Sequence, residues 1–141
     1  MIELHRVTSQ KEKDDAFHVR RVVFIDEQNV PEEIEIDAYD DHSIHLVGYE
    51  NDKPVAAGRL RFVEGYGKLG RICVTKSCRG RSYGKEMILF MEYIVRKEGF
   101  NKTKLNAQIQ AEKFYESLGY VTVSEEFMDA GIPHVTMTKS L

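Results

Sequence analysis

The hydrophobic pattern changes period twice between residues 68 and 108, and no other feature of the 141-residue sequence constrains its fold as strongly. Residues 68–75, KLGRICVT, have the apolar pattern of a β-strand. The segment that follows carries an apolar stripe at helical spacing, formed by Met87, Ile88, Met91, Ile94 and Val95. Gly99 ends this helix, and residues 102–108, KTKLNAQ, return to a strand pattern. A strand–helix–strand unit of this kind predicts a right-handed crossover between two parallel strands.

The segments on either side of this unit predict the remaining elements. Before it, we expect a strand IELHRV, a helix around residues 16–24, and an antiparallel meander of IHLVGYE, VAAGRLRFVE and KLGRICVT. After it, we expect a short helix AEKFYESLGY and two strands, YVTVS and HVTMTKS, joined by EEFMDAGIP. The acidic stretch PEEIEIDAYDD reads as a loop, with or without a turn of helix. The sequence therefore predicts one α/β domain over residues 1–141, with a mixed, mostly antiparallel sheet flanked by helices.

Composition and charge exclude several classes of protein. Lysine and arginine number 20 against 23 acidic residues, so the net charge of −3 lacks the basic excess of a nucleic-acid-binding protein. No apolar run is long enough to span a membrane, and the N-terminal residues lack the apolar core of a signal peptide. We therefore expect a cytoplasmic location. Two cysteines suit a reducing compartment, and the five histidines lack the spacing of a metal site, so no metal is expected.

The loop CRGRSYGKEM, residues 78–87, lies between the strand and the helix of the crossover. An ordinary turn at this place would also contain glycine. However, unpaired N–H groups and the dipole make the first turn of a helix a binding site for anions. Gly80 and Gly84 let a ligand approach the backbone, and the side chains beside them add positive charge or a hydroxyl: Arg79, Arg81, Ser82 and Lys85. The loop matches neither common nucleotide fingerprint, so it indicates a pyrophosphate outside an ordinary ATP or NAD site.

These residues resemble a known family. The run ICVTKSCRGRSYG, followed by the long helix, is similar to the acyl-CoA signature Q/R-x-x-G-x-G/A of the GNAT N-acetyltransferases. Arg79 and Gly84 match its first and last positions, while Ser82 replaces the middle glycine and could donate through its hydroxyl. The segments RRVVFIDEQNVPEE, AQIQAEKFYESLGY and DAGIPHVTM further resemble the small bacterial ElaA/YjcF-like group of this family.

The resemblance implies a cofactor, acetyl-CoA, and a place for each of its parts. In GNAT proteins two parallel strands splay apart and the acyl-pantetheine lies between them; here these strands would be residues 69–75 and 105–108. The resemblance implies that the backbone of Ile72, Cys73 and Val74 pairs with the pantetheine amides. It also places the pyrophosphate in a cradle of the loop residues Arg79, Gly80, Arg81, Ser82, Tyr83, Gly84 and Lys85.

Further contacts follow from the same resemblance. Gln108 stands where many relatives have an asparagine, which suggests a hydrogen bond near the pantetheine arm. Phe114 lies in the short helix that flanks the CoA thiol in this family, although a core position, as for Leu118, is the alternative reading. Cys73 reads as a small buried hydrophobe rather than as a nucleophile, because no histidine is adjacent to it.

The candidate catalytic residues are Tyr115, His134 and Glu27. Tyr115 matches the family tyrosine near the CoA sulfur, where a phenol with an ordinary pKa of about 10 would be a general acid; packing on the sheet is the alternative. The strand glutamate of many GNAT enzymes is absent, and Lys68 lies near its place. The general base is therefore open between Glu27, His134 and an ordered water, and catalysis by positioning alone is the alternative.

Two further segments bear on the acceptor site. Gly131 and Pro133 fix the turn before His134, so residues 131–134 are predicted to form one wall of the acceptor site. The alternative is a histidine that only satisfies a backbone carbonyl. Arg20, on the apolar face of the first helix, either bridges to Asp37 or Asp40 or faces the acceptor groove.

The resemblance predicts an acetyl-CoA-dependent N-acetyltransferase that acts on the primary amine of a small molecule. Amino sugars, amino-sugar phosphates, amino acids and polyamines are all open as acceptors, and so is assembly as a homodimer. The acidic stretch of residues 32–41 would suit a cationic acceptor or is a solvated loop. The alternatives are an acyl-CoA-binding sensor without turnover and a protein lysine or N-terminal acetyltransferase. No nucleic-acid or membrane partner is expected.

Overall fold

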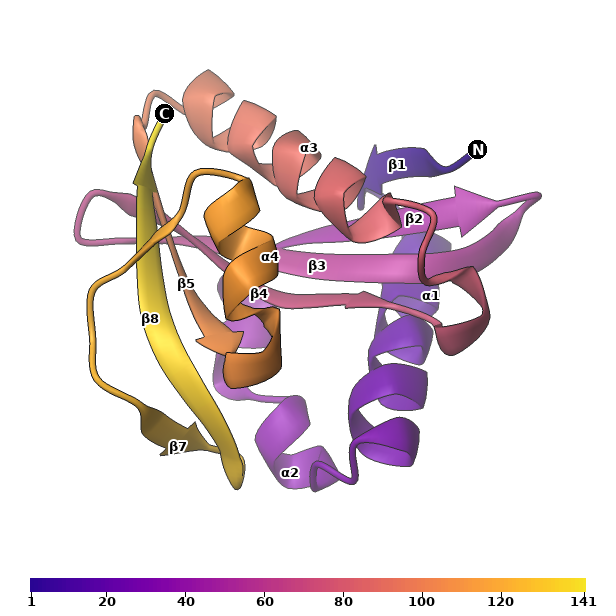
Figure 1. Cartoon of the computed structure of the whole chain (residues 1–141). Helices are drawn as coiled ribbons and strands as arrows, with labels where there is room; N and C mark the ends of the chain where they lie inside the picture. Colours follow the sequence, from indigo (N-terminus) through magenta and orange to yellow (C-terminus); the bar gives the residue numbers. More distant parts are fainter.

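A computed structural model describes residues 1–141 and contains one mixed eight-stranded sheet flanked by helices, as the sequence predicts (Figure 1). The strand order is β1-β2-β3-β4-β5-β8-β6, and β7 pairs with β8 off this path. The strands are β1 (Glu3–Arg6), β2 (Ile44–Glu50), β3 (Lys53–Val63), β4 (Tyr66–Val74), β5 (Lys102–Gln108), β6 (Val121–Thr122), β7 (Phe127–Asp129) and β8 (Ile132–Ser140).

Helices cover both faces of this sheet. The α-helices are α1 (Gln10–Arg20), α2 (Glu32–Glu35), α3 (Tyr83–Lys97) and α4 (Glu112–Ser117). A π-helical segment, η1 (Arg21–Glu27), extends α1, and 3-10 turns form η2 (Ala38–His42), η3 (Lys76–Cys78) and η4 (Ile109–Ala111). No helix is long and apolar enough to cross a membrane.

Alternation along the strands divides the apolar core into two clusters. Leu46 and Ala56 pack with α3 on one face, whereas their neighbours Val47 and Ala57 pack with α1 on the other. The predicted stripe of α3 is buried in the larger cluster: Met87, Ile88, Met91, Ile94 and Val95. Helix α4 also contacts this cluster through Tyr115, and Leu118, which follows the helix, packs there too. The segment from α2 to η2 therefore lies on the same face of the sheet as α1.

The predicted parallel crossover is present, but its two strands pair only briefly. Residues Gly67–Leu69 of β4 pair with Thr103–Leu105 of β5, and beyond them the two strands part. From there β4 continues beside β3, and β5 continues beside β8. A β-bulge in β4 accompanies the separation, because the register with β3 shifts between Ala57 and Arg59. Arg71 lies in the bulge with a φ of 53°, in the left-handed region that a non-glycine residue rarely adopts.

Three segments differ from the simplest reading of their sequence. The acidic stretch contains the turn of helix left open by the sequence, because it forms α2 and η2; Asp37 caps η2 through a capping box. The segment YVTVS keeps only Val121 and Thr122 in a strand, since only these residues pair with β8. The connection EEFMDAGIP contains a further strand, β7, which forms a hairpin with the start of β8.

Candidate functional site

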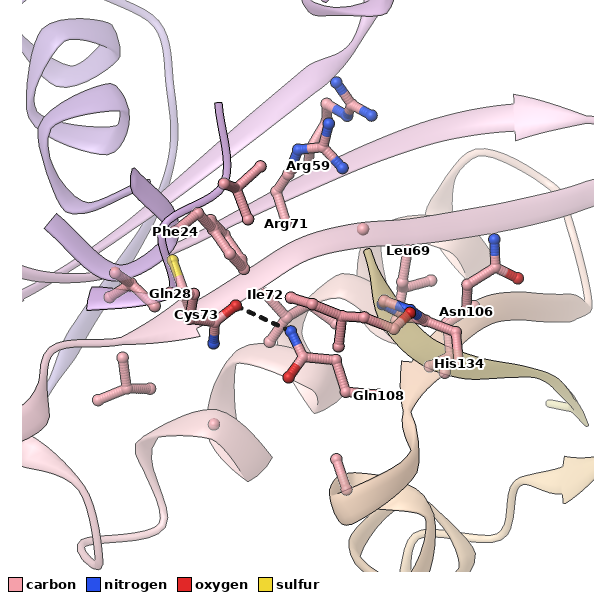
Figure 2. Close-up of a pocket in the computed structure, with 18 of the residues that line it drawn as sticks. Phe24, Gln28, Arg59, Leu69, Arg71, Ile72, Cys73, Asn106, Gln108 and His134 are labelled. Carbon is pink, nitrogen blue, oxygen red and sulfur yellow. Dashed lines mark hydrogen bonds between the residues drawn. The ribbon is translucent and has the colours of Figure 1, made fainter. Parts of the chain in front are cut away.

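A pocket of about 950 Å³ is lined by β4 and β5 around the point where the two strands part (Figure 2). This volume lies near the upper end of the range of small-molecule binding pockets in proteins. One end, which we call the loop end, is lined by Arg79, Gly80, Ser82, Tyr83, Gly84 and Lys85. The other, which we call the sheet end, is lined by Arg59, Arg61, Lys68 and Arg71 from β3 and β4, together with Asp129, Ala130 and Ile132. A single ligand-binding cavity therefore joins the glycine–arginine loop to one face of the sheet.

Between these two ends, β4 presents an unpaired strand edge to the pocket. Cys73 and Val74 pair with Ala57 and Ala56 of β3 on one side. On the other side β5 has moved away, because the pairing of β4 with β5 ends at Leu69. The free backbone groups of an open strand edge bind extended chains that carry amides. The edge therefore fits the amide-bearing arm that the sequence predicts beside it.

The loop end has the geometry of an anion site. Gly80 has a φ of 83°, and a Cβ there would meet no other atom within 4 Å, so the backbone conformation is the reason for glycine. Ser82 also lies in the left-handed region, at a φ of 64°, and its side chain does not cap α3. The first N–H groups of α3 therefore keep no side-chain partner and remain available to an anion.

Two arginines of the loop are paired with carboxylates. Arg79 donates two hydrogen bonds to Glu27, at 2.6 and 2.7 Å, and a third to the carbonyl of Val74 at 3.0 Å. The hydrogen bonds and charge of Arg79 lower the pKa of Glu27. Arg81 donates to Glu50 at 2.7 Å, and the hydroxyl of Tyr83 donates to the same carboxylate. Arg81 and Glu27 are not among the residues that line the pocket.

Tyr115 lines the pocket from α4, with its ring at an edge-to-face angle to Phe114 and Tyr120. Burial raises the pKa of its phenol to about 12, so the hydroxyl keeps its proton at neutral pH. The core reading is wrong for Phe114, because its side chain is exposed and lines the pocket. Leu118, in contrast, packs against the core.

His134 faces the pocket from β8 and lies in register with Gln108 of β5. Its Nδ1 is 2.7 Å from the carbonyl oxygen of Ile132. A carbonyl oxygen only accepts hydrogen bonds, so Nδ1 carries a proton, and in the neutral ring Nε2 keeps its lone pair. The ring also stacks on Phe127, with centroids 6.0 Å apart. The carbonyl-satisfying reading and the catalytic reading are thus compatible, because each uses a different ring nitrogen.

A hydrogen bond that the sequence does not predict crosses the pocket. Nε2 of Gln108 donates to Oε1 of Gln28 at 3.0 Å, and Figure 2 shows this bond. Gln28 follows η1, far from β5 in the sequence, and nothing in its own sequence context indicates the contact. The amide pair links the segment after η1 to the end of β5, beside the free edge of β4.

Neither cysteine has the properties of a nucleophile. Cys73 is buried, and burial raises the pKa of its thiol to about 12. Cys78, the first residue of the loop, is buried and is a free thiol. No group of three or more histidine, cysteine, aspartate or glutamate side chains is placed to hold a metal ion.

The acidic stretch forms a network of buried ion pairs with arginine side chains. Arg20 is fully buried and donates to Glu35 at 3.0 Å and to Asp40 at 2.7 Å. The predicted bridge from Arg20 to Asp40 is therefore present, whereas that to Asp37 is not, because Asp37 accepts from Arg59 at 2.7 Å. The solvated-loop reading is wrong for Glu35 and Asp40, which are buried.

Arg71 joins the same network from the bulge of β4. Its guanidinium donates to the carbonyl of Glu35 at 3.0 Å and to the carboxylate of Asp37 at 3.2 Å. The sequence pattern did not single out Arg59 or Arg71 as partners of the acidic stretch. The charge neutralised in this way is no longer available to attract a cationic acceptor.

The pocket brings together most of the residues that the sequence selected: Ile72, Cys73, Val74, Arg79, Gly80, Ser82, Tyr83, Gly84, Lys85, Gln108, Phe114, Tyr115 and His134. A sheet with two parting parallel strands, an open strand edge and an anion loop at the start of the crossover helix defines an acyl-CoA-binding acyltransferase. Residues 8–141 match the family model described as an acetyltransferase (GNAT) domain. The chain belongs to this family and is an acyltransferase, which makes acetyl-CoA its acyl donor, as the sequence predicts.

Relatives support this assignment along nearly the whole chain. The chain is 48% identical over 132 residues to a protein of Bacillus subtilis (strain 168) named "Uncharacterized N-acetyltransferase YjcF", covering 93% of this chain and 94% of the relative. The crystal structure of Escherichia coli ElaA superposes with a TM-score of 0.86 at 27% identity, covering 99% and 100% of the two chains. The fold is also shared with PaiA N-acetyltransferase from Thermoplasma acidophilum in complex with coenzyme A, at a TM-score of 0.73, 16% identity, and coverage of 100% and 99%.

Proposed function

We propose that the protein transfers an acetyl group from acetyl-CoA to the primary amine of a small molecule. The observation that carries the proposal is the single pocket, which joins an anion loop, an open strand edge and two candidate proton-transfer residues, Tyr115 and His134. The fold neighbour PaiA was solved with coenzyme A, which supports the same ligand for this pocket.

In this proposal the two parts of the pocket hold the two parts of the donor. The free groups of Ile72, Cys73 and Val74 bind the amides of the pantetheine arm along the edge of β4. The first N–H groups of α3 bind the pyrophosphate, because a helix N-terminus favours negative charge. Arg79 exchanges its bonds with Glu27 for bonds to phosphate, and Lys85, which forms no ion pair in the structure, adds a second charge. Gln108 and Phe114 border the same arm.

Acetyl-CoA supplies the acetyl group as a thioester; the transfer forms an N–C bond and breaks the C–S bond. Tyr115 gives its proton to the sulfur, since its raised pKa keeps the hydroxyl protonated until charge develops there. Nε2 of His134 takes the proton that the amine loses, and solvent returns that proton to Tyr115. Glu27 is less suited to the role of base, because both its oxygens accept from Arg79.

The test is Tyr115→Phe, which removes one hydroxyl and keeps the ring. We expect turnover to fall by roughly 10²- to 10⁴-fold, the usual contribution of general acid–base catalysis. The measurement is release of free thiol from acetyl-CoA with a panel of amines, and CoA affinity should be unchanged by calorimetry. Tyr93→Phe, on the exposed face of α3, is the matched control. Full activity in the Tyr115 variant would remove the proposed proton donor.

One observation favours a second candidate function. The structure has Lys68 on β4 near the place where the resemblance leads one to expect a carboxylate, and a missing base fits a sensor that binds acyl-CoA without turnover. The same panel separates the two functions, because a sensor binds CoA and releases no thiol with any amine. The protein-acetyltransferase alternative is tested by adding peptides with a free lysine or N-terminus to the panel.

A further inference from the structure

We propose that the acceptor carries an anionic group, a phosphate or a carboxylate, and that Lys68 and Arg61 bind this group at the sheet end of the pocket. The inference rests on the proposed function, because it names the class of amine that the same site acetylates. It narrows the acceptors to amines with a negative charge several bonds away from the nitrogen.

The first argument is the register of the sheet. Arg61 of β3 pairs with Lys68 of β4, and Lys68 pairs with Lys104 of β5. Paired residues on neighbouring strands project from the same face of a sheet. Three cationic side chains therefore stand side by side across three strands. Like charges in such positions are destabilising, so the arrangement calls for a compensating anion.

The second argument is that the carboxylates of the acidic segment at this end are already ion-paired with other arginines. At the same end of the pocket, Arg59 and Arg71 are ion-paired with Asp37, at 2.7 and 3.2 Å. In contrast, no carboxylate lies within ion-pair distance of Lys68, Arg61 or Lys104. Asp129 lines the pocket from β7 and its charge acts on Lys68, but it is exposed, forms no ion pair with any of the three, and is outweighed by burial and the neighbouring cations.

Two of the three cations contact aromatic rings instead of carboxylates. The guanidinium of Arg61 lies 3.9 Å from the centroid of the Tyr39 ring, which holds it over the pocket lining. The ammonium of Lys104 lies 5.1 Å from the centroid of the Tyr66 ring, outside the pocket lining. Lys68 has neither a hydrogen bond nor a ring contact. It is thus the least compensated charge of the group and the strongest candidate to bind a ligand anion.

Burial adds to the cost of leaving Lys68 without a partner. The side chain is half-buried, and burial, followed by the charges of Arg61, Lys104 and Arg59, lowers the pKa of its ammonium, while the charge of Asp129 opposes this shift without cancelling it. A bound anion would compensate the repulsion among the neighbouring cations. Perturbed charges of this kind inside a cleft are typical of functional sites.

The position of Lys68 fits one end of an acceptor whose other end is acetylated. Lys68 immediately precedes Leu69, where β4 and β5 begin to part, so it borders the space next to the strand edge. His134 is in register with Gln108, four residues along β5 from Lys104. At about 3.3 Å per residue, the four residues from Lys104 to Gln108 separate the positions of Lys68 and His134 by roughly 13 Å along the strands. The side chain of Lys68 spans part of this distance. Amino-sugar phosphates and ω-amino acids fit this spacing, whereas the cationic groups of a polyamine would be repelled.

The kinetic test uses acceptor pairs that differ in one anionic group. Glucosamine 6-phosphate is compared with glucosamine, and 5-aminopentanoate with pentylamine, using thiol release from acetyl-CoA. We expect the wild type to prefer the anionic member of one pair. Lys68→Met should reduce the preference for that member, the ratio of its kcat/KM to that of the neutral member, by roughly 10- to 100-fold, the range of a hydrogen bond to a charged group. Arg61→Gln should act in the same direction.

The control is Lys102→Met, which removes an exposed lysine from the same sheet outside the pocket. This variant should keep the wild-type preference. A higher kcat/KM for glucosamine 6-phosphate than for glucosamine identifies the anion as a phosphate. A higher kcat/KM for 5-aminopentanoate than for pentylamine identifies it as a carboxylate. Equal kcat/KM within both pairs, with amines still acetylated, would overturn the subsite and leave the proposed function in place.

A binding experiment makes the subsite testable without turnover. The protein is saturated with CoA, so that the loop end is occupied, and titrated with glucose 6-phosphate, glucose, glutarate and 1,5-pentanediol by calorimetry. We expect one anion to bind and its neutral counterpart not to bind, and Lys68→Met to weaken that binding by roughly 10- to 100-fold. Anion binding of this kind without acetylation of any amine would overturn the proposed function alone. Failure of both anions to bind would overturn the subsite.

Discussion

At the scale of single residues, the two proposed proton-transfer groups are prepared for opposite tasks by different means. Burial holds the proton on Tyr115 by raising its pKa to about 12. A backbone carbonyl holds the proton of His134 on Nδ1 and so leaves Nε2 free to accept one. Both residues could be selected from the sequence, because each lies in a segment that resembles the GNAT family. It could not assign the tautomer, which depends on where the carbonyl of Ile132 lies after folding.

His134→Gln tests the proposed base. If His134 accepts the amine proton, kcat/KM in the wild type falls at acidic pH because the imidazole is already protonated, and this limb is lost or displaced in the variant. We expect kcat at pH 7 to fall by roughly 10²-fold or more. The measurement is a pH–rate profile, with His18→Gln on the exposed side of α1 as the control. An identical profile for wild type and His134→Gln would exclude this residue as the base.

At the scale of elements, the change of hydrophobic period predicted the crossover, but not the point at which its strands part. That point depends on the short pairing of β4 with β5 and on the bulge, where Arg71 adopts a positive φ without a glycine to signal it. For the acidic stretch the sequence left open whether a turn of helix forms, because charges mask a short helix whose one buried side chain, Glu35, is itself acidic. Sequence patterns report burial of apolar groups, so a segment fixed by buried ion pairs escapes them.

The anion loop makes a prediction at the same scale. In Gly84→Val the new Cβ would meet Phe114 and Val74, whose nearest atoms lie 3.8 and 4.0 Å away, in ordinary van der Waals contact. The added methyl groups would occupy space at the start of α3 where we propose that the pyrophosphate binds. We expect CoA affinity to fall by at least about tenfold, as expected for loss of a charge-assisted hydrogen bond.

The measurement for Gly84→Val is calorimetry with CoA, and thermal unfolding of the same sample serves as the control for folding. Ser77→Val, in the exposed turn before the loop, should bind CoA like the wild type. Wild-type affinity in a folded Gly84→Val protein would mean that the pyrophosphate lies elsewhere.

At the scale of the whole molecule, one buried network joins the segment from α2 to η2 to α1 and to the sheet. Arg20 contributes from α1, Glu35 and Asp40 from the acidic segment, and Arg59 and Arg71 from β3 and β4. The same network bounds the sheet end of the pocket, since Glu35, Asp37 and both strand arginines line it. Folding of the acidic segment and formation of the proposed acceptor site are therefore coupled.

Arg20→Met should destabilise the fold strongly. The variant leaves the buried carboxylates of Glu35 and Asp40 without their main partner, which typically costs about 3–5 kcal/mol. The measurement is the free energy of unfolding from urea denaturation. Arg21→Met is a matched control, because Arg21 is exposed and pairs only with the exposed Glu32, so its loss should change stability by less than about 1 kcal/mol. Equal stability of the two variants would contradict the role given to the network.

Low pH should weaken the same network by protonating the carboxylate of Asp40. Burial alone would raise the pKa of this carboxyl, but the hydrogen bond and charge of Arg20 outweigh it and lower the pKa from 3.8 to about 2. A folded-state pKa below the unfolded value means that the carboxylate stabilises the fold above about pH 4 and that this contribution is lost as the pH falls toward 2. The shift corresponds to about 2 kcal/mol at neutral pH. Between pH 5 and pH 2, Asp40→Asn should therefore lose less of its unfolding free energy than the wild type, by about that amount. The control is Asp41→Asn, which alters an exposed neighbour and should show the wild-type dependence of unfolding free energy on pH. The same wild-type dependence in Asp40→Asn would show that Asp40 is not held ionised by Arg20.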